Sequence, residues 1–549
     1  MRIDHITKLI AIVIVTALLA ACNPWDDHIE LTNQGLNETV MDVLKQQPDL
    51  TTFAKILEVT GYDSILVQPQ NYTVFAPTNA AWSGLDTTDK SLMCRYVKNL
   101  ITPKSIPLVS NAFTVSKVQM LNGKFIPVSG KSIDGNELSQ WNLLAGNGII
   151  HKLAVTLQPR LNIWEFINQD TYSSNHQVTF LNQQKQRTMD LNKSYLLYLD
   201  EQGHPVYDTA WIESNQWLSR YALNNEDSAY TVLLLDGEAY SALKEKYTPY
   251  FSIYSTTINT DGVRISTFRK NETDNQVLAE ITRDMMLKPV TLTGGETALS
   301  LDGVKVRIPA SAIDMSYRAS NGMVYLINSA EVKMYQNKIK DIQLEGEDYL
   351  YSNVASTVIS KRFKDWASGN FDVVLSGRDV NGLYALSSQS TAFYSNIMNS
   401  YLAFAPQLNS VPYKVYWKSY DDLAAHVTAN ANVPQKMFFS VPGAPSLTWT
   451  SGGVVTNNFN DSLVFIGQNT AGMNVETELG MWVTTGTNKL VAREQLASHP
   501  DFAVDRLPCY SFGTASIWVS NNAFSTNNTT GGSLFLDYIR LVPQVNPDE

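Results

Sequence analysis

The chain has few of the residues from which metal and disulfide sites are built. It carries three cysteines and seven histidines among 549 residues. Cys94 and Cys509 lie far apart and fit no CxxC spacing, so neither a disulfide framework nor a cysteine metal site is expected. Both are expected to be small buried hydrophobes. The histidines are scattered without the spacing of metal ligands, so we predict no metal site and no cofactor.

Catalytic motifs are also missing from the sequence. HExxH and GxSxG do not occur. The "GKS" at residues 130–132 lacks the glycine of a phosphate-binding loop, because Phe125 stands at that position. His151 lies in an apolar run and is expected to be a core histidine. Carboxylate pairs such as Asp421 and Asp422 would suit a glycosidase, but such neighbours usually form a solvated face. We therefore predict that the protein is not an enzyme.

Positive charge is in deficit. The chain has 41 basic and 52 acidic side chains, which gives a formal net charge of −11. A surface with this balance repels phosphate backbones, so we predict no nucleic-acid partner. With 44% hydrophobic residues the chain can bury several cores, and its length predicts three or four domains.

The longest apolar run lies at the N-terminus. Residues 9–20 follow Arg2 and Lys8 and are too few to span a bilayer, which predicts a signal peptide over residues 1–21. The run ends in "LAAC", and small residues before a cysteine resemble a bacterial lipobox. That resemblance implies cleavage before Cys22, which then carries lipid such as palmitate. The alternative is ordinary secretory cleavage with a cysteine nearby by chance.

The residues that follow Cys22 indicate the cellular location of such an anchor. Asp26 and Asp27 lie within the acidic linker of residues 22–35. They resemble the acidic export signal that some diderm bacteria use to send lipoproteins to the outer face. The alternative is a solvated linker that happens to be acidic. The resemblance implies a lipid-anchored protein of the outer membrane, exposed at the cell surface.

Two sequence patterns recur in the same order. Residues 71–82 read "NYTVFAPTNAAW" and residues 229–243 read "AYTVLLLDGEAYSAL"; each is a β-rich run followed by turn residues and a helix start. Residues 147–155, "NGIIHKLAV", and residues 321–332, "NGMVYLINSAEV", share an Asn-Gly turn that feeds an apolar strand. The repetition predicts two related domains.

The first pair of segments resembles the two signature segments of the fasciclin domain family. The resemblance implies tandem α+β domains, the first over residues 36–159 and a divergent second copy over residues 160–336. Such domains are, by this resemblance, adhesion and binding modules without known chemistry of their own. Asn99 stands where the family often has a histidine, so no Tyr-His pair is assigned.

The second copy departs further from the family pattern. Asp236 stands where the first copy has Pro77, and Tyr325 stands where it has His151. An added stretch, residues 171–218, separates its first helix from its Tyr-Thr-Val strand, and most of this stretch is polar.

Helical periodicity is nearly absent from residues 337–549. Short alternating strands parted by Gly, Asn and Ser predict an all-β jelly roll or β-sandwich. The segments "YKVYW" and "LDYIRLVP" resemble galactose-binding-type jelly rolls at the level of the fold. Alternation places Tyr413, Val415 and Trp417 on one face, which is expected to be the core face.

The predicted ligand site lies in loops of this C-terminal region. An exposed indole at Trp449 would stack on a sugar ring, and nearby amides would exchange hydrogen bonds with sugar hydroxyls. Those amides belong to Asn457, Asn458, Asn521 and Asn522. The alternatives are a tryptophan tucked against the end of the sandwich and asparagines that only form turns.

The layout predicts a non-catalytic surface lipoprotein that binds an extracellular glycan or protein. It is similar to accessory lipoproteins found beside starch-utilisation-type transporters, in which a TonB-dependent barrel pairs with a lipoprotein lid. Partners would then be the membrane, through the lipid anchor, the ligand and such a transporter. Two alternatives stay open: an adhesin that contacts host matrix or other cells, and a glycan-active enzyme with its site in the C-terminal sandwich.

Overall fold

A computed structural model describes residues 37–546 except for a set of internal segments. Those segments are residues 109–115, 259, 261–263, 346–357, 363–372, 379–383, 389–400, 420–433, 441, 443–447, 451–452, 456–459, 467–474, 483–489, 492–510, 522–534 and 537. The predicted signal peptide, Cys22 and the acidic linker lie outside the described residues. The chain divides into two compact units. Unit 1 extends to Phe166 and includes Ala222–Ala229 and Arg318–Gly322; unit 2 holds the remainder.

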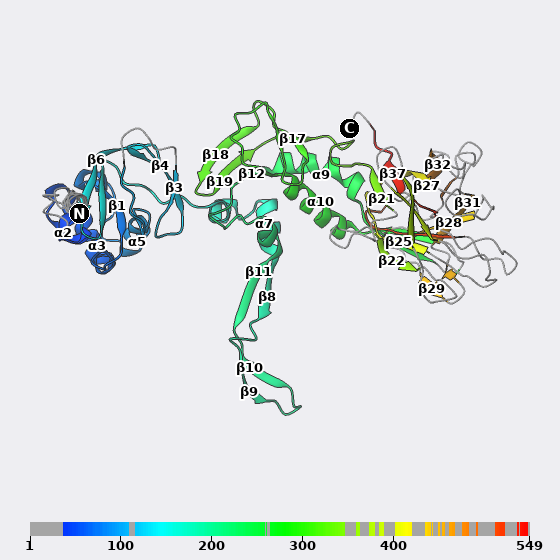
Figure 1. Cartoon of the computed structure of the whole chain (residues 1–549), viewed down its shortest axis with the longest axis horizontal. Helices are drawn as coiled ribbons and strands as arrows, with labels where there is room; N and C mark the ends of the chain where they lie inside the picture. Colours follow the sequence, from blue (N-terminus) through cyan, green and yellow to red (C-terminus); the bar gives the residue numbers. More distant parts are fainter. Residues whose placement is uncertain are drawn as a thin grey trace, which may run out of the picture. The chain divides into compact units, whose positions relative to one another are not determined.

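Unit 1 is built on a seven-stranded sheet with the strand order β2-β1-β7-β6-β5-β4-β3 (Figure 1). The strands are β1 (Tyr72–Pro77), β2 (Ile101–Thr102), β3 (Ser116–Gln119), β4 (Phe125–Ser129), β5 (Ser132–Ile133), β6 (Asn136–Ala145) and β7 (Gly148–Leu153). β1 runs parallel to β7, and the other neighbouring strands of this sheet are antiparallel. β1 and β7 are buried along their whole length, as their near-continuous apolar sequences predict.

Short helices supply the rest of the core of unit 1. They are α2 (Val40–Lys45), α3 (Thr51–Thr60), α4 (Asp63–Leu66) and α5 (Lys90–Lys98). A further short helix, α6 (Ile163–Ile167), lies where unit 1 ends along the chain. A capping box between Thr39 and Asp42 starts α2, and Gly61, with a φ of 83°, ends α3. The helix start expected after Pro77 is a single 3-10 turn, Asn79–Trp82, and the side chain of Thr78 makes no cap hydrogen bond there.

Unit 2 contains a four-stranded sheet in the order β15-β12-β19-β18, the order of β2-β1-β7-β6 in unit 1. Its strands are β12 (Tyr230–Leu235), β15 (Met286–Leu287), β18 (Ile313–Ala319) and β19 (Gly322–Ile327), and the turn between the last two belongs to unit 1. Further elements are α7 (His176–Gln183), α8 (Gln216–Arg220), α9 (Gly237–Phe251), α10 (Lys270–Asp284), β13 (Tyr254–Ile258), β14 (Arg264–Phe268), β16 (Thr297–Leu299), β17 (Lys305–Arg307) and β20 (Glu331–Val332).

The two Asn-Gly turns make the same hydrogen bonds. The Oδ1 of Asn147 accepts from the backbone N–H of Val40 at 2.7 Å, and its Nδ2 donates to the carbonyls of Leu66 and Gln68 at 2.7 and 2.9 Å. The Oδ1 of Asn321 accepts from the N–H of Ile163 at 2.8 Å, and its Nδ2 donates to the carbonyls of Leu223 and Asn225 at 2.8 and 3.0 Å. Each asparagine therefore fixes the first turn of a helix to the turn before an apolar strand.

The added stretch of the second repeat forms α7 and a two-part ribbon (Figure 1). β8 (Lys185–Met189) pairs with β11 (Trp211–Asn215), and β9 (Tyr195–Leu199) pairs with β10 (Pro205–Asp208). We call residues 185–215 the arm. The polar character expected of this stretch does not hold for β9, whose five residues are all apolar or aromatic and all exposed.

Residues beyond 337 form two five-stranded antiparallel sheets within unit 2. One has the order β21-β37-β27-β32-β33 and the other β22-β25-β35-β28-β31. The bounds are β21 (Ile342–Glu345), β22 (Val358–Arg362), β25 (Tyr401–Phe404), β27 (Tyr413–Ser419), β28 (Pro434–Ser440), β31 (Asn460–Ile466), β32 (Val475–Trp482), β33 (Leu490–Val491), β35 (Ser516–Asn521) and β37 (Tyr538–Pro543). Smaller pairings join β23 (Val373–Arg378), β24 (Tyr384–Ser388) and β36 (Phe535–Leu536); β26 (Gln407–Leu408) and β34 (Gly513–Thr514); and β29 (Thr448–Thr450) and β30 (Gly453–Val455).

A single hydrophobic cluster runs from the helices of unit 2 into both of these sheets. It contains Tyr247 of α9, Tyr413 of β27 and Ile517 of β35. Tyr413 and Val415 are buried, as their alternation predicts, whereas the side chain of Trp417 lies outside the described ones. The core therefore continues across the expected domain boundary between residues 336 and 337.

Candidate functional site

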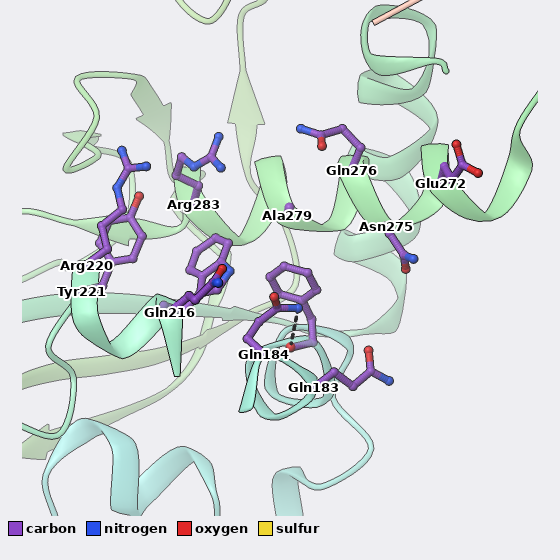
Figure 2. Close-up of a pocket in the computed structure, with 12 residues that line it drawn as sticks. Gln183, Gln184, Gln216, Arg220, Tyr221, Glu272, Asn275, Gln276, Ala279 and Arg283 are labelled. Atoms are coloured by element: carbon purple, nitrogen blue, oxygen red, sulfur yellow. Dashed lines mark hydrogen bonds between the residues drawn. The ribbon is translucent and has the colours of Figure 1, made fainter. Parts of the chain in front are cut away.

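A pocket of about 560 Å³ opens between three helices of unit 2 (Figure 2). α7 contributes Phe180 and Gln183, with Gln184 directly after it. α8 and the residue after it contribute Gln216, Trp217, Arg220 and Tyr221, and α10 contributes Glu272, Asn275, Gln276, Ala279 and Arg283. Three helices far apart in sequence therefore supply one polar and aromatic lining.

Two asparagine caps position the helices of this pocket. Asn175 caps α7 by accepting hydrogen bonds from the N–H groups of Gln177 and Val178. Asn215 caps α8 in the same way, and its Nδ2 donates to the carbonyl of Leu181 on α7 at 2.7 Å. Because one amide serves both helices, α8 keeps a fixed place beside α7 although it is only five residues long.

Three aromatic rings form one wall. Phe180 meets Trp217 edge to face, with ring centroids 5.2 Å apart and an interplanar angle of 85°. Trp217 and Tyr221 lie 5.3 Å apart at 34°. Phe180 and Tyr221 are buried, whereas Trp217 is half-buried. The indole is therefore the ring that a ligand in the pocket can reach.

The positive charges of the lining are already paired. Arg220 donates to Asp302 at 2.9 Å, and Arg283 donates to Glu280 at 2.6 Å. The hydroxyl of Tyr221 donates to Asp302 at 3.0 Å, and burial, with this carboxylate beside it, raises the pKa of Tyr221 to about 12. Tyr221 thus stays neutral at ordinary pH, and the pocket is not built to bind an anion.

Five neutral amides complete the lining. Gln276 donates to Glu280 at 2.9 Å, and Gln184 makes a 3.4 Å bond to the carbonyl of Phe180. Gln183, Gln216 and Asn275 are exposed. Figure 2 shows Asn275 extending from α10 toward α7. Each amide can donate and accept, which suits a ligand that carries several hydroxyl groups.

A buried charge network adjoins the pocket through Glu280 of α10, which also accepts from Gln276 and Arg283. Nζ of Lys338 contacts Oε2 of Glu280 at 2.7 Å and Oδ1 of Asp284 at 2.8 Å. The hydroxyl of Tyr247 donates to Asp284 at 2.6 Å, and burial raises the pKa of that carboxyl. Because Lys338 and Asp284 are buried, the network holds the segment before β21 against α10 and offers no open site.

His151 is a core residue, as the sequence predicts. Its Nδ1 accepts from the N–H of Asn142 at 3.2 Å, so Nε2 carries the proton and donates to the carbonyl of Ile106 at 3.0 Å. Burial lowers the pKa of His151 to about 4, which keeps the ring neutral. At the matching place in unit 2, the hydroxyl of Tyr325 accepts from the N–H of Leu292 at 2.9 Å.

The ligand site expected in the C-terminal region lies largely outside the described residues. The loop expected around Trp449 is wrong, because this residue lies in β29 of a small hairpin with β30. Asn521 is the last residue of β35 and pairs with Gln435. The side chains of Trp449 and Asn521 lie outside the described ones, as do the whole residues Asn457, Asn458 and Asn522. That site stays a prediction.

Within the described ranges, no group of three or more His, Cys, Asp or Glu side chains is placed to hold a metal ion. No helix of that same part of the chain is long and apolar enough to cross a bilayer.

Comparison with known proteins assigns part of unit 1. Residues 48–159 match the model of the Fasciclin domain. This segment is similar to the fasciclin domain family. The match confirms the α+β fold expected for the first copy, and it ends before the second repeat and the C-terminal sheets.

Curated relatives align with part of the chain. Transforming growth factor-beta-induced protein ig-h3 of Sus scrofa is 27% identical over 134 residues, which cover 23% of this chain and 20% of the relative. Periostin of Homo sapiens is 25% identical over 134 residues, 22% of this chain and 16% of the relative. A FAS1 domain-containing protein of Saccharomyces cerevisiae is 36% identical over 89 residues, 16% of this chain and 9% of the relative. The chain thus spans a fifth or less of the length of these relatives.

A solved structure also aligns with the chain. It is a FAS1 domain pair from the insect cell adhesion molecule Fasciclin I, 13% identical, covering 52% of this chain and 97% of that one with a TM-score of 0.20. At that score the likeness supports no inference about function.

Proposed function

We propose that this protein is a non-catalytic extracellular binding protein, and that its ligand is a glycan held in the pocket between α7, α8 and α10. The observation that carries the proposal is the composition of the lining: a reachable indole at Trp217, five neutral amides, and guanidinium groups already paired with carboxylates. An indole face and amides that both donate and accept match the apolar face and the hydroxyls of a sugar ring. The match of residues 48–159 to the Fasciclin domain supports a binding role, because the resemblance to that family implies an adhesion or binding module.

The finer architecture belongs to the same proposal. Residues 160–336 are a divergent second fasciclin-like domain, supported by the repeated strand order and by the matching bonds of Asn147 and Asn321. Residues 337–549 are a galactose-binding-like β-sandwich, supported by two five-stranded antiparallel sheets that share one core.

The setting of the protein is proposed from its N-terminal sequence. Cys22 carries the lipid that anchors the chain at the outer membrane, and Asp26 and Asp27 direct it to the cell surface. There it serves as an accessory to a TonB-dependent, starch-utilisation-type uptake system. The lipobox-like "LAAC" supports the anchor, and the transporter follows only from the resemblance in layout.

A glycan array with the full chain tests the ligand class, and variants test the site. For a glycan that the array selects, we expect Trp217→Ala to weaken binding about tenfold, since losing a stacked ring costs on the order of 1 kcal/mol or more. Asn275→Ala, at an exposed position, should weaken binding without affecting the fold. Trp211→Ala is the matched control, because Trp211 is 49% exposed and lies on the arm.

Other outcomes would redirect the proposal. Loss of binding in Trp449→Ala, with Trp217→Ala unaffected, would place the site in the C-terminal sheets as the sequence predicts. If the chain binds cells or matrix but no glycan on the array, the second candidate function, an adhesin, is favoured. The match to the Fasciclin domain also supports that function. Turnover of a bound glycan by the purified chain would show that the protein is an enzyme.

A further inference from the structure

One carboxylate outside the pocket lining contacts three side chains of that lining. Asp302 accepts hydrogen bonds from Arg220 at 2.9 Å and from the hydroxyl of Tyr221 at 3.0 Å. Its Oδ2 also lies 3.6 Å from Nε of Arg283. Figure 2 shows these three lining side chains at the same end of the pocket. A single residue therefore sets the charge that this end of the lining presents to a ligand.

A tight turn between β16 and β17 holds Asp302 in place. Gly303 follows it with a φ of 83°, a conformation that glycine adopts without strain, and its N–H donates to the carbonyl of Ser300 at 3.0 Å. On the other side of Asp302, the N–H of Leu301 donates to the carbonyl of Met286 at 2.8 Å. Because the backbone is fixed on both sides, the turn presents the carboxylate to α8 and α10 from a set position.

Other guanidinium groups at the pocket are paired in the same way. Arg283 contacts Glu280 at 2.6 Å, and Arg269 contacts the lining residue Glu272 at 2.8 Å. An acidic sugar in the pocket would lose hydration of its charge and would find these guanidinium groups already paired. A neutral sugar carries no such cost. The charge balance of the lining therefore favours a neutral ligand.

We propose that Asp302 determines the specificity of the pocket: by pairing with Arg220 and Arg283, it restricts the ligand to neutral glycans and excludes acidic ones. This inference rests on the proposed function, glycan binding between α7, α8 and α10. Without the charge of Asp302, Arg220 would offer a planar guanidinium that binds carboxylates through two parallel hydrogen bonds. The side chain of Arg220 is 58% exposed, so an acidic sugar in the pocket could then reach it.

Asp302→Asn in the full chain tests this inference, because asparagine keeps the shape and an accepting oxygen but removes the charge. The neutral probe is a glycan that the array selects. The acidic probe is the same glycan after its primary hydroxyl groups have been oxidised to carboxylates. Titration calorimetry gives both affinities, and the ratio of acidic to neutral affinity should rise about tenfold in Asp302→Asn, the effect of a gained hydrogen bond between charged groups. High salt should reduce the rise.

Three further variants separate this effect from a general change of charge or fold. Glu331→Gln is the matched control, because it removes the same charge from an exposed pair with Arg307 outside the lining, and it should leave the ratio unchanged. Adding Arg220→Gln to Asp302→Asn should cancel the rise, since the released guanidinium is then gone. Gln183→Lys adds an unpaired cation at an exposed lining position and should also raise the ratio, which keeps the test valid if Asp302→Asn does not fold. Circular dichroism checks the fold of each variant.

Several results would overturn the inference. They are an unmodified chain that binds the acidic probe as tightly as the neutral one, an unchanged ratio in a folded Asp302→Asn, and an unchanged ratio in Gln183→Lys. In each of these cases, neutral binding that is weakened in Trp217→Ala would leave the proposed function standing. A chain that binds no glycan at all, or that binds one equally well in Trp217→Ala, would overturn the proposed function and this inference with it.

Discussion

Replacing Asn147 by alanine should destabilise unit 1 more than most single side-chain losses. This amide joins three backbone groups of different segments: the N–H of Val40 and the carbonyls of Leu66 and Gln68. Asn147 is itself buried, at 9% exposed. Truncation removes all three hydrogen bonds and leaves their partners in place.

The magnitude follows from which partners water can reach. Gln68 is exposed, so its carbonyl can be hydrated in the variant. Val40 and Leu66 are fully buried, so one N–H and one carbonyl lose their partners. A buried group left without a hydrogen bond costs about 1–3 kcal/mol, which gives roughly 4 kcal/mol for the pair.

Native-state hydrogen exchange on the full chain measures this loss of stability. In Asn147→Ala the slowest amides of β1 and β7 should exchange about a thousandfold faster, because each 1.4 kcal/mol corresponds to roughly a factor of ten. Gln68→Ala is the control, since it keeps the carbonyl that accepts the bond and should change exchange little. A loss below about 1 kcal/mol would refute the reasoning, because it would mean that water or a rearranged backbone replaces the amide.

Four further predictions concern single side chains. Burial lowers the pKa of His151 to about 4, so below about pH 6.5 the unfolded state binds the proton more readily than the folded state. The free energy of unfolding of unit 1 should therefore fall by roughly 3 kcal/mol between pH 6.5 and 4. Chemical denaturation at a series of pH values should show this fall, and His151→Gln should show a weaker dependence on pH. Lys338→Met leaves Asp284 buried and unpaired and should cost about 3–5 kcal/mol in denaturation of unit 2. Gly148→Ala drives a Cβ into the backbone carbonyl oxygen of Tyr72 on β1 and should lower the melting temperature and the soluble yield of the chain. Palmitate labelling should disappear in Cys22→Ala, and labelling that survives would remove the anchor.

The repeated strands could be predicted from the sequence. β1 and β7 are continuous apolar runs, and the Asn-Gly turn before β7 recurs before β19, so local patterns alone predict both. The short 3-10 turn found in place of the helix expected after Pro77 was harder to predict from the sequence. The amide of Asn79 bonds to the N–H of Thr52 and the carbonyl of Pro48, and no local rule announces these partners.

The pocket was not visible in the sequence. Its lining comes from α7, α8 and α10, and the arm and several strands separate these helices along the chain. α8 has only five residues, which is too short to show a helical period. The caps at Asn175 and Asn215 were local signals, since asparagine favours a helix start.

The exposure of the arm also could not be predicted from the sequence. A run such as "YLLYL" is typical of a buried strand, yet β9 is exposed throughout because no further strand or helix of unit 2 covers it within the described residues. Whether such a strand is buried depends on what packs against it, and its own five residues do not specify this.

The most direct test of glycan binding in the α7–α8–α10 pocket is hydrogen exchange of the full chain with and without a glycan selected on the array. Bound glycan should slow exchange in residues 216–221 and 270–284, which carry Trp217 and Asn275, and should leave β29 and β35 unchanged. Protection confined to β29, β35 and their neighbours would contradict the account and move the site to the C-terminal sheets. An array on which no glycan binds would contradict the proposed ligand class itself.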